Sequence, residues 1–304
     1  MDPLKHSYYE AVFERNYLKK GGNEFQDFFS EIMEKCHPGD FQRVRPWGNA
    51  GDRKNDGYLR SECTLFQVYA PNEMEARGAI AKIHEDFHGA LKQWSKYLNK
   101  WTFVHNSRDG LGPGVLEKLL ELDASYTSVS VCSWGFEELR LHVFNTLNEA
   151  DLASLLGPAP SSRDMFDVRY ENVQEVLNNI AKQEPSQSQD LRPIPSDKLK
   201  FNRLSGAVQT LLTSGMWMAH RVGEFFNDHP NPRYGDEVAL AFSKEYKKWK
   251  ILSMESDIIF FKLQEFAGGQ KRGTPTYEAA VLAVIAYLFE QCDIFERSPE
   301  EVTS

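Results

Sequence analysis

The sequence predicts a mixed α/β domain in the N-terminal half and an all-α bundle in the C-terminal half. Within residues 1–150, short runs that alternate apolar and polar side chains, such as TLFQVYA at 64–70, lie between stretches with helical spacing. From Lys198 onward the helical spacing dominates. Residues 151–197 are rich in Pro, Ser and Gln, as linkers are. We therefore expect domains at 1–150 and 198–304, joined by a linker at 151–197.

The elements of the first domain follow from the spacing of apolar side chains. A mixed central sheet flanked by helices, in the order αββαβαβα, accounts for this alternation. The predicted elements are a helix over 5–35, short strands within 41–70, a helix over 73–98, a strand at 101–106, a helix at 112–121, a strand at 127–134 and a helix at 135–147.

The linker contains one short helical segment, at 166–180. In the C-terminal bundle the most apolar segment is AAVLAVIAYLF at 279–289, about half the length that a membrane span requires. We expect no membrane contact. Two interpretations of this segment stay open, namely the centre of the bundle and a contact between two copies of the chain. A homodimer through the C-terminal domain is therefore one prediction.

Composition limits the classes of function. The 304 residues carry a net charge of −9, so the protein is not coated in basic surface, and nucleic acid would have to bind at a local patch or a bound metal. The N-terminal segment MDPLKHSYYEAVFERNY lacks the features of a signal peptide, and the four cysteines are widely scattered. We expect a cytoplasmic protein with reduced thiols.

A candidate metal site lies around residues 51–71. Asp56 precedes a strand on which Gln67 and Tyr69 share one face, and Glu24 lies on the first predicted helix. Carboxylates and carbonyl oxygens are the ligands that hold Mg²⁺ or Mn²⁺, and such ions activate water for phosphodiester hydrolysis. Acidic residues ahead of a strand also occur in solvated hairpin turns, so this spacing leaves both interpretations open.

The order NEFQDFF…VRPWGNAGDRKNDG…FQVYAP…WTFVHN resembles the restriction-endonuclease-like, PD-(D/E)xK superfamily. It is most similar to the branch with a helix glutamate, a GD-x-x-x-D turn and a Gln-x-Lys strand. The resemblance implies a restriction-endonuclease-like fold and Mg²⁺-dependent cutting of DNA. Carried over by position, it implies that Glu24, Asp56 and Gln67 bind the metal.

The chain departs from that pattern at one position. Tyr69 stands where the family has its lysine, and a phenol with an ordinary pKa near 10 supplies no positive charge at neutral pH. Lys54 in the turn and Lys82 on the following helix are the candidate replacements. The alternative is a catalytically inactive protein that binds nucleic acid or serves as a scaffold.

Basic and aromatic side chains near the same turn form a candidate contact to phosphate. They are Arg43, Arg45, Arg53 and Trp47. Ordinary surface cations at a turn are the alternative explanation.

The segment HEDFH at 84–88 matches the H-E-x-x-H pattern of zinc proteases, with His84 and His88 on one helix face and Glu85 as the base. No third histidine follows at the spacing that such enzymes use. A zinc metalloprotease is therefore a weaker alternative.

The C-terminal pattern KLKFN…EAAVLAVIAYLFEQCDIFE looks like the C-terminal domain of effectors in bacterial ABC-three component defence systems. The resemblance implies that a variable effector domain precedes a shared helical domain. It also implies two partners, a middle-component protein and an ABC-type ATPase, and a role in antiviral defence.

Overall fold

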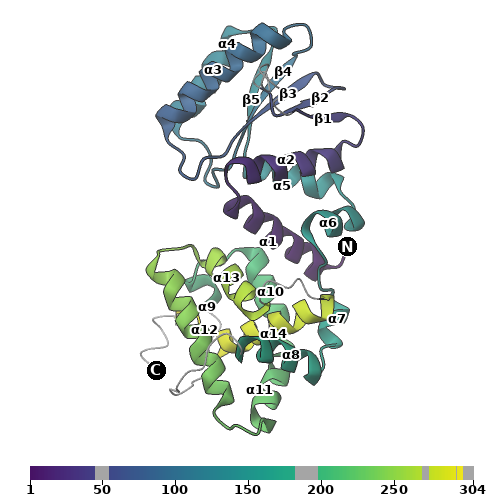
Figure 1. The fold of residues 1–304 in the computed structure, drawn as a ribbon, viewed down its shortest axis with the longest axis vertical. Helices are drawn as coiled ribbons and strands as arrows, with labels where there is room; N and C mark the ends of the chain where they lie inside the picture. The colour runs from purple at the N-terminus through teal and green to yellow at the C-terminus, as the bar shows by residue number, and fades with distance from the viewer. Residues whose placement is uncertain (45–54, 182–197, 269–273, 292, 297–304) are drawn as a thin grey trace. The chain divides into compact units, whose positions relative to one another are not determined.

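The computed structural model describes residues 1–44, 55–181, 198–268, 274–291 and 293–296. The chain divides into two compact units, one of residues 13–155 and one of residues 1–12 with 156–304. The first contains a five-stranded sheet with helices, and the described part of the second is helical (Figure 1). The predicted mixed α/β region followed by a helical region is thus confirmed.

The sheet of residues 13–155 is mixed, with the spatial order β1-β2-β3-β4-β5. The first three strands pair antiparallel, whereas β3, β4 and β5 run parallel because α3 and α4 form the crossovers. The strands are β1 Phe41–Arg43, β2 Gly57–Leu59, β3 Thr64–Tyr69, β4 Lys100–His105 and β5 Ser130–Trp134. The helices are α1 Pro3–Lys19, α2 Gly22–Cys36, α3 Ala76–Trp94, α4 Pro113–Ser125, α5 Phe136–Thr146 and α6 Glu149–Leu156, and residues 3–12 of α1 and Leu156 of α6 belong to the second unit.

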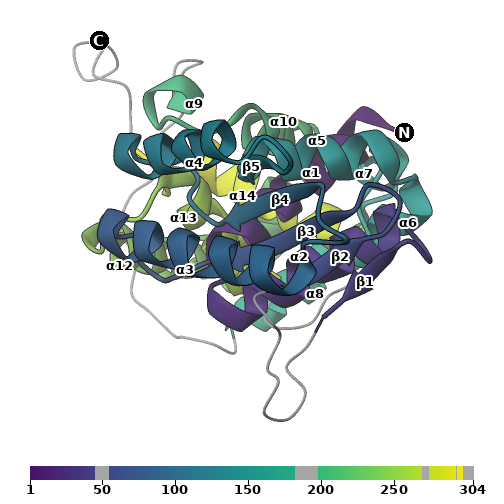
Figure 2. The ribbon, with the colours of Figure 1, turned by 90° about the horizontal axis from the view of Figure 1, so that it is seen from above.

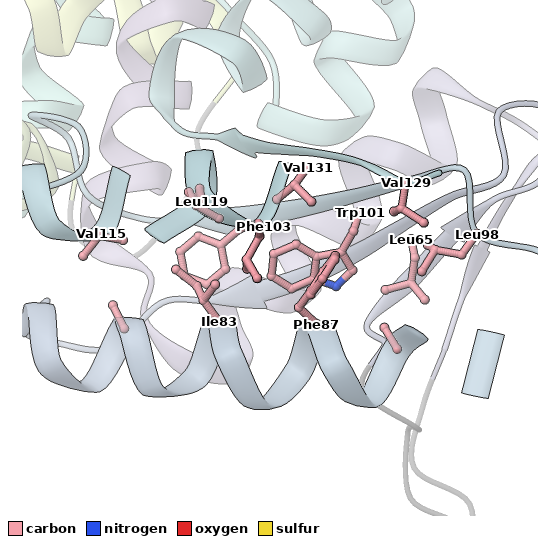
Figure 3. Packing of buried hydrophobic residues seen from close by; sticks show 13 residues of the cluster. Leu65, Ile83, Phe87, Leu98, Trp101, Phe103, Val115, Leu119, Val129 and Val131 are labelled. Atoms are coloured by element: carbon pink, nitrogen blue, oxygen red, sulfur yellow. The ribbon is translucent and has the colours of Figure 1, made fainter. Parts of the chain in front are cut away.

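Both faces of the sheet are covered by helices. Helices α3 and α4 lie beside each other over one face, and Figure 3 shows Ile83 and Phe87 of α3 pointing toward Phe103 and Trp101 of β4 (Figure 2). On the other face, Phe66 packs against Phe29 of α2 with ring centroids 5.4 Å apart. Alternation along β3 therefore places one set of side chains under α3 and the other set under α2.

Two details of this unit differ from the sequence prediction. The single helix expected over 5–35 is two helices, which are separated at Lys20 and Gly21, and Gly22 begins the second with a φ of +50°. The Gly22 amide donates to the Ala70 carbonyl at 2.6 Å, so a contact with the end of β3 fixes the break. Three strands, not two, lie between residues 41 and 70.

The second unit is built around α14. Its residues from Ala279 to Ala286 are all buried, and α8, α10, α11 and α13 pack against it. Burial within one chain therefore accounts for the apolar run, as the first of its two interpretations required. The helices are α7 Ser162–Phe166, α8 Tyr170–Ala181, α9 Lys198–Phe201, α10 Gly206–Met216, α11 Ala219–Asp228, α12 Tyr234–Ile251, α13 Ser256–Gly268 and α14 Pro275–Glu290.

The segment that begins with Lys198 forms hydrogen bonds with the end of α14 and with the residues that follow it. The Lys198 ammonium group is fully buried and donates to the carbonyls of Phe289 and Ile294, at 2.8 and 2.7 Å. Asn202 donates to the Glu296 carbonyl and accepts from the Glu296 amide. The bond to Phe289 satisfies a carbonyl that the end of α14 leaves without a regular helical partner, and the others tie down the segment after the helix.

Candidate functional site

Asp56 is the centre of the polar cluster beside β3. Its carboxylate is buried, with 5% of the residue exposed. One oxygen, Oδ2, accepts from Gln67 Nε2 at 2.8 Å and from the Val68 amide at 2.7 Å. The other oxygen, Oδ1, accepts from the side chain of Gln26 on α2. The structure thus brings together Asp56 and Gln67, two of the three residues predicted to bind metal.

Backbone pairing explains why Asp56 and Gln67 meet. Gly57 of β2 and Phe66 of β3 are register partners, and Asp56 comes directly before Gly57, which places it beside Gln67 and Val68 of β3. The Asp56 amide donates to the Phe66 carbonyl at 2.9 Å. Asn55 accepts from the Gly57 amide at 2.8 Å, which fixes the turn just ahead of β2.

Gln67 carries a buried polar atom without a partner. The residue is 4% exposed, and its amide nitrogen is bound to Asp56. Its amide oxygen, Oε1, has no hydrogen-bond partner among the described residues. An unsatisfied buried acceptor destabilises a fold by roughly 1–3 kcal/mol. Such an oxygen beside a carboxylate is chemically suited to binding a cation.

Glu24 lies in the first turn of α2 with an exposed side chain. The contacts of the described residues join Asp56 to Gln26 of that turn, not to Glu24. Gln26 is not among the residues predicted to bind metal, although it follows Glu24 by two residues in the motif NEFQDFF.

Tyr69 belongs to the apolar layer under α3. Its ring lies 5.9 Å from the ring of Phe103 and packs against the buried cluster around Ile83 and Phe87. Tyr69 thus shares the sheet face of Gln67 but is part of the hydrophobic packing.

Lys82 forms an ion pair on its own helix. Its ammonium nitrogen lies 2.9 Å from the carboxylate of Asp86, whose side chain is fully buried. The charge of Lys82 therefore compensates a buried acid on α3. Lys54, the other candidate for the missing positive charge, lies outside the described residues.

Arg43, a predicted phosphate contact, is already paired within the unit. Its guanidinium group binds Asp27 at 2.9 Å and Glu34 at 3.0 Å, both on α2. The other predicted contacts, Arg45, Trp47 and Arg53, lie outside the described residues.

The HEDFH segment lies on α3, where hydrogen bonds occupy His88. Its Nδ1 lies 2.7 Å from the His84 carbonyl oxygen, and its Nε2 lies 3.1 Å from the hydroxyl of Tyr126. A zinc ligand needs one ring nitrogen free for the metal. Over the described ranges, no group of three His, Cys, Asp or Glu side chains is placed to hold a metal. Among the described residues, a cation at Asp56 would therefore have amide oxygens as its other side-chain ligands.

His105 lies at the end of β4, in register with Tyr69 of β3. It is 3% exposed, and burial lowers its pKa to about 4, against a smaller opposing effect of Glu138. The ring is therefore neutral at neutral pH. Its Nδ1 atom is a further buried polar atom for which the described part of the chain provides no hydrogen bond.

Comparison with known proteins identifies the class of the C-terminal region. Residues 171–296 match a family of C-terminal domains from ABC-three component (ABC-3C) systems. The matching family is C-terminal domain 10 of these systems. The predicted resemblance of this region is thus confirmed. Neither curated proteins nor solved structures gave a match.

No helix in the described ranges combines the length and the hydropathy that a span requires.

Proposed function

We propose that this protein is the effector of an ABC-3C antiviral defence system and that its N-terminal unit is a metal-dependent nuclease that cuts DNA. The observation that carries the nuclease proposal is the pairing of Asp56 with Gln67 at the edge of β3, next to a buried amide oxygen without a partner. The order of α2, three antiparallel strands, α3 and β4 is compatible with a restriction-endonuclease-like fold.

The proposed cofactor is Mg²⁺ or Mn²⁺. Asp56 and Gln67 offer a carboxylate and an amide oxygen, and hard cations of this kind prefer oxygen ligands. The ion would activate water and offset negative charge at the phosphate. Glu24 stays a prediction as a ligand.

The chain's own residues would then hold and orient the ion. The Val68 amide donates to Oδ2 of Asp56, and this contact would keep the carboxylate oriented when the Gln67 oxygen binds the ion. Contact to DNA through Arg45, Arg53 and Trp47, and positive charge from Lys54, are parts of the proposal that depend on residues outside the described ranges.

The helical unit would attach the effector to its partners. Its match to an ABC-3C C-terminal domain supports docking onto other components of the same system, which we propose to be a middle-component protein and an ABC-type ATPase. A homodimer through this unit remains a prediction.

A second candidate function is an inactive nucleic-acid-binding or scaffold protein. It is favoured by the pairing of Lys82 with Asp86, because Lys82 then supplies no free positive charge at the site. Tyr69, which stands where the family has its lysine, is uncharged at neutral pH.

Plasmid cleavage with Mg²⁺ or Mn²⁺, in the presence of the partner components, separates the two functions. We expect cleavage by the full chain, loss of cleavage in Asp56→Asn, and unchanged cleavage in Glu117→Gln, which alters an exposed acid on α4. Asp56→Asn keeps the side-chain shape, and its thermal unfolding is measured in parallel so that a folding defect is recognised. An intact plasmid with every protein would refute the nuclease proposal and favour the scaffold.

A further inference from the structure

We infer that Gln26 is the residue of α2 that completes the cation site, so that the site consists of Asp56, Gln26 and Gln67. This inference rests on the proposed function, because it concerns the same cation. The two proposals differ in the residue of α2 that binds the cation. The family pattern assigns this role to Glu24, whereas we assign it to Gln26.

Helix geometry separates Glu24 from Gln26. Successive residues of an α-helix are rotated by about 100°, so the two side chains leave the helix about 200° apart. Phe25 lies between them and is fully buried, so they occupy opposite flanks of the buried stripe. Gln26 occupies the flank that reaches Asp56, whereas Glu24 lies on the opposite flank with an exposed side chain.

The two glutamines act on Asp56 in the same way from different elements. Gln26 donates to Oδ1 and Gln67 donates to Oδ2, so the carboxylate lies between two amide groups. The nitrogen and oxygen of an amide exchange places by a half turn about the last side-chain torsion. A carboxylate without a cation attracts the nitrogens, whereas a cation would attract the oxygens.

Gln67 gives the second, independent sign of a ligand. Its amide oxygen is buried and lacks a hydrogen-bond partner in the described part of the chain, although its nitrogen is satisfied by Asp56. A cation beside Asp56 would satisfy that oxygen after the half turn. From the described residues this site has one carboxylate and two amide oxygens, a low charge that a second carboxylate would raise, with stronger binding as the result.

The substitution Gln26→Glu separates a ligand from a simple hydrogen-bond donor. If Gln26 is a ligand, a glutamate supplies an equivalent oxygen with charge, and we expect Mn²⁺ to bind about tenfold more tightly. If Gln26 only donates to Asp56, the glutamate places like charges together and weakens the site. Gln26→Met, of similar length, should weaken Mn²⁺ binding about tenfold in the ligand case.

The experiment measures free Mn²⁺ by electron paramagnetic resonance during titration of the purified full chain. The control is Glu31→Gln, at an exposed acid of the same helix, which should bind like the wild type, whereas Asp56→Asn should abolish binding. Glu24→Gln tests the ligand that the family pattern assigns. Thermal unfolding gives a second readout, because added Mn²⁺ should raise the midpoint more in Gln26→Glu than in the wild type.

The possible outcomes separate this inference from the nuclease proposal. Weaker binding in Gln26→Glu, unchanged binding in Gln26→Met, loss of binding in Glu24→Gln, or no binding by the wild type would each overturn the role of Gln26. If Asp56→Asn abolishes binding and cleavage while Gln26→Met changes neither, the nuclease proposal stands and only this inference fails. If Mn²⁺ binds as expected but DNA stays intact, the role of Gln26 stands and the nuclease proposal fails.

Discussion

The ammonium nitrogen of Lys198 lies 2.8 Å from the carbonyl oxygen of Phe289, which follows it by 91 residues. The same ammonium group lies 4.4 Å from the centroid of the Phe289 ring. A fully buried lysine is costly unless its charge is compensated and hydrogen-bonded. Here it binds one carbonyl near the end of α14, that of Phe289, and one in the segment that follows, that of Ile294.

Replacing Lys198 should destabilise that unit. Lys198→Met keeps the apolar stem but leaves the carbonyls of Phe289 and Ile294 without this donor, so we expect a loss of about 2–4 kcal/mol in the free energy of unfolding. Urea unfolding followed by circular dichroism measures it. Lys200→Met is the control, because Lys200 is exposed two residues later. Equal stability of the two variants would show that the buried contacts contribute little.

Gly215 allows α10 to approach α14 closely. A Cβ atom at this position would lie 2.4 Å from the Leu282 carbonyl oxygen and 2.9 Å from the Ala286 Cβ. Gly215→Ala should therefore force the helices apart and lower stability by about 1–3 kcal/mol. Gly206→Ala, at the start of the same helix, meets no atom within 4 Å and should be neutral or slightly stabilising. The thermal midpoints of the two variants should differ accordingly.

His105 should make the sheet unit less stable in acid. Its folded pKa of about 4 lies below the ordinary value of about 6.5, so only the unfolded chain is protonated between these values. The stabilisation is full above pH 6.5 and is lost as the pH falls toward 4, by about 2 kcal/mol between pH 7.5 and pH 5. Burial, with a smaller effect of His37, lowers the pKa of His142, which adds to the loss in the same direction.

The variant His105→Gln isolates the contribution of His105. The wild type and the variant are unfolded with denaturant at pH 7.5 and pH 5, and the change in stability between the two pH values is compared. A smaller change in the variant is expected. An equal change would assign the acid sensitivity to other groups.

The HEDFH segment should not bind zinc stoichiometrically. Both ring nitrogens of His88 are engaged, by the His84 carbonyl and the Tyr126 hydroxyl. Metal analysis of the purified protein should find no stoichiometric zinc, and the zinc content should be the same in His84→Ala. A zinc chelator should leave the unfolding midpoint of this unit unchanged. Near-stoichiometric zinc that is lost in His84→Ala would instead support the zinc metalloprotease.

Part of the candidate site could be predicted from the sequence. The alternation TLFQVYA placed Gln67 on a defined strand face, and the acid just ahead of the preceding strand made Asp56 its neighbour once those strands paired. The choice of Gln26 could not be predicted in this way. It depends on how α2 is rotated over the sheet, which the burial of Phe25 and Phe29 decides.

The sequence by itself determined the order of a mixed α/β region and a helical region, and it marked the run at 279–289 as buried. These features follow from the spacing of apolar residues along the chain, which a single sequence is enough to show. Only the tertiary structure decided the break between α1 and α2, the packing of Tyr69 under α3 and the contact of Lys198 with the end of α14. Each of these depends on groups distant in the sequence, whose contacts arise when the helices and strands pack.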